Sequence, residues 1–302
     1  MKSFEKICRM SQKILKDYTS RQLASTHDKV IVGDGFVYAQ GEFPVLLVAH
    51  LDTVHKELPY VIHYNTDDDS MSSPTGIGGD DRCGVYMVLE IVKRFNCSVL
   101  FCEDEEIGGV GAEKFIKTDL ARGLQFNYII EFDRKGNNDA VFYNCDNPDF
   151  TEFITSEFYK EAWGTFSDIS VLAPHLGCAA VNLSCGYYKA HTKDEYVVLS
   201  EMVNSINAAC KILERTTEND KFEYVEAVHY YGYSYNYDSW YDEYDMRSGY
   251  YLIEYMDMKG KTQWYETMAN SEAEAVGKFC MQYPRLSYED IIDICVDENI
   301  YI

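Results

Sequence analysis

Histidine and acidic residues occur in five short groups spread over about 140 residues, and each group follows a stretch typical of a buried β-strand. Imidazole and carboxylate groups are side chains that hold divalent cations in proteins. The carboxyl ends of parallel strands meet at one edge of a sheet, so side chains placed there converge. The groups are His50-Leu51-Asp52, Asp80-Asp81-Arg82, Glu105-Glu106, Asp133 and His191. We therefore predict that they form one two-metal hydrolytic site.

The first two groups each leave an alternative open. His50 with Asp52 suits a metal-binding imidazole, because a carboxylate on the second ring nitrogen fixes the tautomer. A strand-end histidine before a polar turn is the alternative. Asp80 and Asp81 lie between glycines, which let a backbone approach a ligand closely. An acidic glycine turn is the alternative there, and two facing aspartates repel unless a cation or Arg82 compensates them.

The third group contains four adjacent carboxylates, Glu103 to Glu106, after a buried strand. Such a cluster is costly unless it is solvated or bound to metal. One carboxylate can bind a metal while its unligated neighbour accepts a proton from water. A solvated acidic loop is the alternative. Asp133 closes the next strand as a natural terminal ligand, with Glu131 as the fallback.

Apolar runs alternate with helical periodicity along the first two thirds of the chain. Strands are predicted at 44–49, 98–101, 128–132 and 179–183, and helices at 85–95, 112–117, 149–163 and 200–215. An amphipathic helix at the N-terminus, a hairpin over 30–38, an outer strand at 60–64 and a loop over 65–76 complete this part. The pattern predicts an α/β fold, with a mostly parallel twisted sheet and helices on both faces.

Composition excludes some classes of partner. The net charge of −23 would repel a nucleic acid backbone. No apolar stretch is long enough to span a membrane, and the first residues lack the features of a signal peptide, so we expect a cytoplasmic protein. The ten cysteines form no Cys-x-x-Cys pair, which favours reduced thiols.

The composition changes near Thr216. From there to the end the chain has 18 acidic and 6 basic residues and many tyrosines. A hairpin over 250–256 and 262–266, a helix over 271–281 and a strand at 291–296 predict a small α/β module. We therefore predict a catalytic domain at 1–215 and an acidic, tyrosine-rich accessory domain at 216–302. Its segment 230–247 is interpreted as a linker or an interaction surface, for a protein partner or for self-association.

Together the motifs resemble co-catalytic zinc exopeptidases over residues from about 25 to 215. The nearest family is the peptidase T and acetylornithine deacetylase superfamily, and lid-less zinc aminopeptidases are also similar. The motifs are Ala49-His50-Leu51-Asp52-Thr53-Val54, Gly79-Asp80-Asp81-Arg82-Cys83-Gly84, Asp104-Glu105-Glu106-Ile107-Gly108 and His191-Thr192-x-Asp194-Glu195.

The resemblance implies two divalent metal ions, zinc in this family, and a role for each site residue. Asp80 would bridge the ions, with His50 and Asp133 on one and Glu106 and His191 on the other. Glu105 would be the general base, and Asp52 would orient His50. The family also implies a cis peptide bond between Asp80 and Asp81.

One departure from the family concerns the substrate. Deacetylase-like members insert a lid domain between the positions of Asp133 and His191, but only 57 residues separate them here. The missing lid favours an aminopeptidase acting on short peptides. The alternatives are an N-acyl amino acid deacylase, or a metal-binding interaction protein that acts through its C-terminal module. Five residues in two loops are predicted to line the substrate pocket: Ser167, Asp168, Gly186, Tyr187 and Tyr188.

Overall fold

The computed structural model divides the chain into two compact units, Met1–His229 and Tyr230–Ile302, which are described separately. It describes residues 2–164, 166–227, 249–257, 261–269, 276, 278, 279, 282, 283 and 291–297. None of the helices in these ranges is long and apolar enough to cross a bilayer.

The first unit is built on an eight-stranded sheet in the order β1-β2-β6-β3-β7-β10-β8-β9. Its four central strands are parallel to one another, and the flanking hairpin β1–β2 and strand β8 run antiparallel to their inner neighbours. The strands are β1 Lys29–Gly33, β2 Phe36–Gln40, β3 Phe43–His50, β6 Cys97–Cys102, β7 Tyr128–Arg134, β8 Asp139–Val141, β9 Lys160–Ala162 and β10 Ala180–Ser184.

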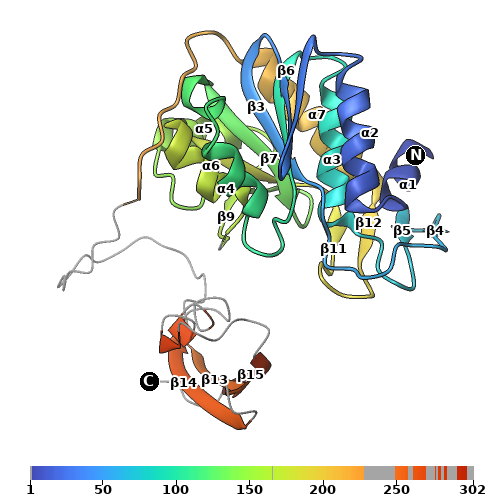
Figure 1. The fold of residues 1–302 in the computed structure, drawn as a ribbon, viewed down its shortest axis with the longest axis vertical. Coiled ribbons are helices and arrows are strands. Elements are labelled where there is room, and N and C mark those ends of the chain that lie inside the picture. Colours follow the sequence, from blue (N-terminus) through green and yellow to red (C-terminus); the bar gives the residue numbers. More distant parts are fainter. Residues whose placement is uncertain are drawn as a thin grey trace. The chain divides into compact units, whose positions relative to one another are not determined.

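Apolar side chains of the central strands alternate between two faces, and helices cover both. On β3, Val45, Leu47 and Ala49 enter one core cluster, while Leu46 and Val48 enter the other. The first face carries α1 Lys2–Cys8, α2 Gln12–Leu23, α3 Gly79–Ile91 and α7 Leu199–Arg215, and the second carries α4 Val110–Ile116 and α6 Asp168–Leu176 (Figure 1). The predicted α/β fold with a mostly parallel, doubly covered sheet is confirmed.

A smaller antiparallel sheet lies in the loops of the first unit, in the order β11-β12-β5-β4. Its strands are β4 His63–Asn65, β5 Ser70–Ser72, β11 Tyr187–Tyr188 and β12 Tyr196–Val198. Strand β5 falls inside the stretch 65–76 that was predicted to be a loop. This sheet joins the segment before Asp80 to the segment that carries His191.

Several predicted elements differ from the structure. The N-terminal helix is two helices, because Ser11 caps α2 by accepting a hydrogen bond from the backbone N–H of Ile14. The helix predicted over 149–163 ends early, as α5 Pro148–Thr155. The residues after it form β9, which pairs in parallel with β8, so tertiary pairing overrides local helical periodicity. Helix α6 and the short 3₁₀ turn Ala121–Gly123 were not predicted.

The segment after α7 packs against the first unit. Phe222 contacts the rings of Phe150 and Phe153, each at 5.1 Å between centroids. Isolated bridges join Glu223 to Cys178 and Glu226 to Cys145. Residues 216–227 therefore belong to the first unit, beyond the predicted boundary at Arg215.

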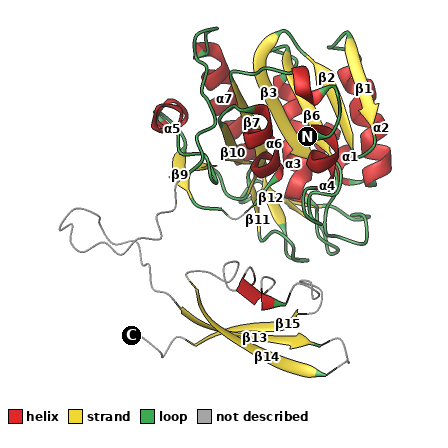
Figure 2. Cartoon of the chain, turned by 60° about the vertical axis from the view of Figure 1, so that its left-hand side comes forward, coloured by secondary structure: helices red, strands yellow, loops and turns green. Residues whose placement is uncertain are grey.

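The second unit contains an antiparallel sheet in the order β14-β13-β15 (Figure 2). Its strands are β13 Gly249–Met256, β14 Thr262–Ala269 and β15 Ile291–Asp297, close to the predicted hairpin and last strand. Tyr251, Ile253, Tyr255 and Phe279 form its core. Residues 276, 278, 279 and 282 are helical, and most of the helix predicted over 271–281 lies outside the described residues, as does the stretch 230–247.

Candidate metal centre

The five predicted ligands come from five separate segments at one edge of the large sheet. His50 is the last residue of β3, Asp133 lies near the end of β7, and Glu106 follows β6. Asp80 lies at the start of α3, where it and Asp81 have non-helical backbone angles and share a cis peptide bond, as the resemblance implies. His191 lies in the loop between β11 and β12. The structure brings all five side chains together.

Their ligand atoms form two groups that share Asp80. In the first group, His50 Nε2 lies 3.2 Å from Asp80 Oδ1 and 3.4 Å from Asp133 Oδ1. In the second, His191 Nε2 lies 3.1 Å from both Asp80 Oδ2 and Glu106 Oε2. Asp80 thus presents one carboxylate oxygen to each group, which is the arrangement of a bridging ligand.

Two further observations indicate that these residues fit two metal ions. Ligand atoms about 2.0–2.1 Å from a tetrahedral zinc ion lie about 3.3 Å from one another, close to the separations in both groups. Glu106 Oε1 is buried and has no hydrogen-bond partner among the described residues. Such an atom is costly unless a cation or water satisfies it.

Arg82, which follows the two aspartates in the sequence, does not balance the charges of the cluster. The buried guanidinium of Arg82 donates to the backbone carbonyls of Met10 and Leu51 instead of to the carboxylates. Burial and the charge of Asp80 raise the pKa of Asp133 to about 6. Bound cations would supply the positive charge that these groups lack.

Asp52 connects the first group to the loop of the glutamates. Its Oδ1 lies 3.2 Å from His50 Nδ1 and accepts the backbone N–H of Glu105 at 3.0 Å, and its Oδ2 accepts that of Glu106 at 3.1 Å. The pKa of Asp52 is lowered, because burial is outweighed by these hydrogen bonds. Asp52 thus lies where the predicted orienting residue should be, and it also fixes the glutamate loop.

The glutamate loop is held from its other side by α2. Gln12 Nε2 donates to Asp104 Oδ1 at 2.9 Å, and Lys16 Nζ lies 2.5 Å from Glu103 Oε2. Asp104 has a φ of 62° and His191 a φ of 64°. Non-glycine residues rarely adopt this left-handed conformation, and it is found where surrounding contacts enforce it.

Comparison with solved structures identifies the fold. Aminopeptidase PepT from Bacillus cereus is 14% identical, with 70% of this chain and 96% of that chain covered, at a TM-score of 0.55. An aminopeptidase from the archaeon Desulfurococcus kamchatkensis is 15% identical, with 72% and 94% covered, at a TM-score of 0.56. A tripeptidase from Staphylococcus aureus is 12% identical, with 70% and 96% covered, at a TM-score of 0.53. The chain shares the fold of these three proteins. In sequence, neither a protein-family model nor a curated protein matches.

Beside the ligand cluster, Glu195 is a residue that sequence reasoning did not single out. Its fully buried carboxylate accepts the backbone N–H of Gly78 at 2.7 Å and that of Asp80 at 3.0 Å. It also pairs with His55 Nε2 at 2.8 Å. Glu195 closes the motif that begins at His191, but no role was assigned to it. It fixes the segment that presents Asp80 to both groups.

We predict that Glu195→Gln weakens metal binding by about 10- to 100-fold, as loss of a residue that orients ligands usually does. One carboxylate oxygen becomes an N–H₂ group facing the donors of Gly78 or Asp80, so Asp80 loses its fixed position. Zinc affinity measured by competition with a chelator dye checks this. The matched control is Asp194→Asn, an exposed neighbour. Equal affinities for Glu195→Gln and the unmodified protein would contradict the prediction.

The predicted substrate residues separate into two sets. Tyr187 donates to Asp133 Oδ1 at 3.2 Å, and Ser167 Oγ donates to Glu131 and lies 3.2 Å from Asp133 Oδ2. Asp168 is fully buried at the start of α6, and burial raises its pKa to about 7. Tyr188 stacks on Tyr196 and donates to Glu201, while Gly186 pairs through its backbone with Gly136. Of the five, Tyr187 lines the cavity at the ligand cluster, and Ser167, Asp168, Gly186 and Tyr188 are not among the residues that line it.

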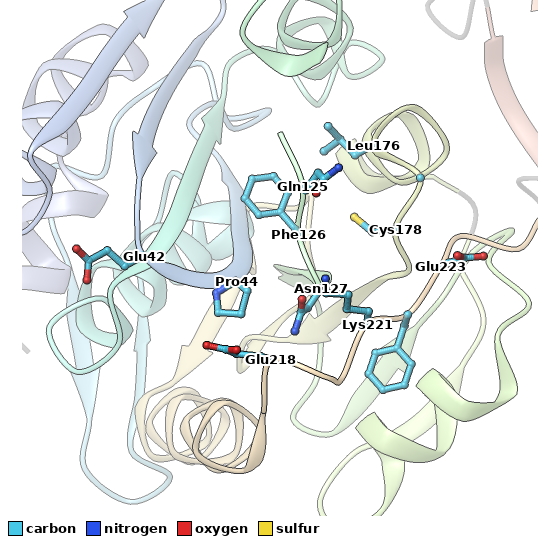
Figure 3. A pocket seen from close by; sticks show the side chains of 12 residues that line it. Glu42, Pro44, Gln125, Phe126, Asn127, Leu176, Cys178, Glu218, Lys221 and Glu223 are labelled. Carbon is cyan, nitrogen blue, oxygen red and sulfur yellow. The ribbon is translucent and has the colours of Figure 1, made fainter. Parts of the chain in front are cut away.

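That cavity has a volume of roughly 330 Å³ and opens onto the ligand cluster. It is lined by Asp80, Glu105, Glu106, Asp133, Arg134, Lys135, Tyr143, Gly164, Phe166, Tyr187, Ala190 and His191. A second cavity, of roughly 540 Å³, lies by Pro44 and Asn127, where β3 and β7 begin (Figure 3). It contains none of the predicted ligands, and ligands of open α/β sheets bind at the opposite, carboxyl end of the strands.

Proposed function

We propose that this protein is a metal-dependent exopeptidase that releases amino-terminal residues from short peptides, with two zinc ions and Glu105 as general base. The proposal rests on Asp80, whose two carboxylate oxygens each face one of the two groups of histidine and carboxylate ligands. Glu105 lines the same cavity without belonging to either group. An unligated carboxylate beside two ligand groups is what metal-assisted hydrolysis requires.

The two cations would lower the pKa of a water molecule and polarise the scissile carbonyl. Glu105 accepts the proton of the attacking water and delivers it to the nitrogen of the leaving amine. Burial and the charges of Asp133, Asp168 and Glu106 raise the pKa of Glu105 to about 9. Cations held by Asp133 and Glu106 would offset two of these charges and lower this pKa toward neutrality.

The choice of substrate rests on the fold and on the cavity. The neighbours in structure are aminopeptidases and a tripeptidase. The cavity, at roughly 330 Å³, is at the lower end of the range for small-molecule sites, which suits a short peptide. No lid domain is inserted between Asp133 and His191.

The test has two measurements on one sample. Elemental analysis of freshly purified protein gives the identity and number of the metal ions. A digest of di- and tripeptides, read by mass spectrometry, gives the cleaved end, and a parallel set of N-acyl amino acids tests the deacylase alternative. Release of amino-terminal residues supports the proposal. Protein with both ions in place that cleaves none of the peptides would refute it.

Metal binding is expected to strengthen with pH. Hydrogen bonds to Asp80 and Glu106 raise the pKa of His191 to about 11 in the absence of metal. Its imidazole is therefore protonated at neutral pH, and a metal ion must displace that proton. For each displaced proton, the apparent affinity for the metal ion rises about tenfold when the pH is raised by one unit. Below pH 6, Asp133 adds a second proton, since its pKa is about 6.

Calorimetry of zinc binding in buffers with different ionisation enthalpies counts the released protons. We expect at least one proton per protein at pH 7.5, and a larger number at pH 5.5. If zinc bound without proton release at both pH values, His191 would have kept its proton and would not be a ligand.

A further inference from the structure

Two basic side chains line the otherwise acidic cavity. Arg134 and Lys135 directly follow the predicted ligand Asp133 and face the cavity that contains Glu105. Arg134 uses its Nε to donate to Asp139 Oδ2 at 3.2 Å. Within the described part of the chain, its two Nη groups and the ammonium of Lys135 have no hydrogen-bond or ion-pair partner. In a chain with a net charge of −23, the free Nη groups of Arg134 and the free ammonium of Lys135 beside the ligand cluster point to an anionic group of the substrate.

The backbone that carries these two residues is fixed on both sides. The carbonyl of Arg134 accepts the N–H of Cys185 at 2.8 Å, and that of Lys135 accepts Ser184 Oγ at 2.8 Å. The next residue, Gly136, donates to the carbonyl of Tyr187 at 2.9 Å. The two cations therefore start from fixed positions beside Asp133, as a binding site for part of a substrate requires.

We infer that Arg134 and Lys135 bind the free carboxylate at the leaving-group end of the substrate. This inference rests on the proposed function. The two Nη groups of a guanidinium match the two oxygens of a carboxylate, and a neighbouring ammonium adds a point charge. A short peptide is positive at its amino end and negative at its carboxyl end. The acidic wall of the cavity suits the positive amino end, and Arg134 with Lys135 suits the negative carboxyl end.

The shared chemistry of the substrates is thus an amide whose amine product carries a carboxylate close to the scissile bond. Dipeptides and tripeptides have this group, and so do N-acyl amino acids. Longer peptides place their carboxylate beyond a cavity of roughly 330 Å³. Arg134 and Lys135 would therefore select short peptides in a protein that has no inserted lid domain.

The experiment compares each substrate with its carboxamide. A tripeptide and its C-terminal amide are assayed with the zinc-loaded full chain, and an N-acetyl amino acid and its amide form a second pair. We expect amidation to lower kcat/KM by about 10- to 100-fold, mainly through KM, because charge-assisted hydrogen bonds of a non-reacting group bind substrate and transition state alike. In the double variant Arg134→Met/Lys135→Met, the acid and the amide should differ by less than about threefold.

Two controls keep the inference separate from the proposed function. Lys193→Met removes an exposed cation that does not line the cavity, and it should keep the full preference for the acid. Lys135→Met alone, at an exposed position, should lose part of the preference even if the double variant does not fold. Equal cleavage of acid and amide by the unmodified protein would overturn the inference and leave the peptidase proposal intact. Cleavage of neither member of either pair would refute the proposed function itself.

Discussion

Glu105→Gln is expected to lower kcat by about 10²- to 10⁴-fold while both metal ions remain bound. Glutamine has nearly the same shape but cannot accept the proton of the attacking water. The backbone N–H of residue 105 still donates to Asp52, so the loop keeps its position. Neither ligand group includes the Glu105 carboxylate, so no metal contact is lost. Steady-state kinetics with a tripeptide and elemental analysis of the same preparation measure both effects.

The matched control for this variant is Glu103→Gln in the same loop. Glu103 pairs with Lys16 on α2 and does not line the cavity, so kcat should change by less than about threefold. Loss of one ion in Glu105→Gln would instead make Glu105 a ligand. An unchanged kcat with both ions bound would remove it from the reaction.

The central fold could be predicted because burial leaves a simple signal. Strands covered on both faces are mostly apolar runs. Such runs mark β3 and β6, and β7 and β10 have them with one polar interruption each, at Glu131 and Asn182. The elements that were missed lack such a signal. Strands β8, β9, β11 and β12 have three residues or fewer, and distant backbone segments define them. The helix α6 contains Pro174, a residue that usually marks the end of a helix.

The candidate ligands were accessible for a related reason. Each lies just after a predicted strand or in a motif that resembles the zinc exopeptidases, so strand ends and motif resemblance together indicated the set. Glu195 was not accessible, because its partners Gly78 and Asp80 are more than 100 residues away. The same holds for Gln12, which contacts Asp104 across 92 residues. Residues that position the site through long-range hydrogen bonds become visible only in the folded chain.

Asp80→Asn is expected to reduce the metal content from two ions to less than one and to bring peptide cleavage to background. Asp80 faces His50 with one oxygen and His191 with the other. The asparagine amide has a single oxygen, so one group faces an N–H₂ that cannot bind a cation. The other group keeps a neutral oxygen in place of a charged one. The metal affinity of both sites should therefore fall by more than the roughly 10- to 100-fold that is typical of residues that only orient a ligand.

The comparison with Asp133→Asn makes this prediction specific to bridging. Asp133 belongs only to the group of His50, so its replacement should release one ion and leave the group of Glu106 and His191 occupied. A shared carboxylate predicts a definite order of metal content. The native protein should hold two ions, Asp133→Asn one ion, and Asp80→Asn fewer than one. If Asp80→Asn and Asp133→Asn each retained one ion, Asp80 would serve a single site, and the two groups would be independent.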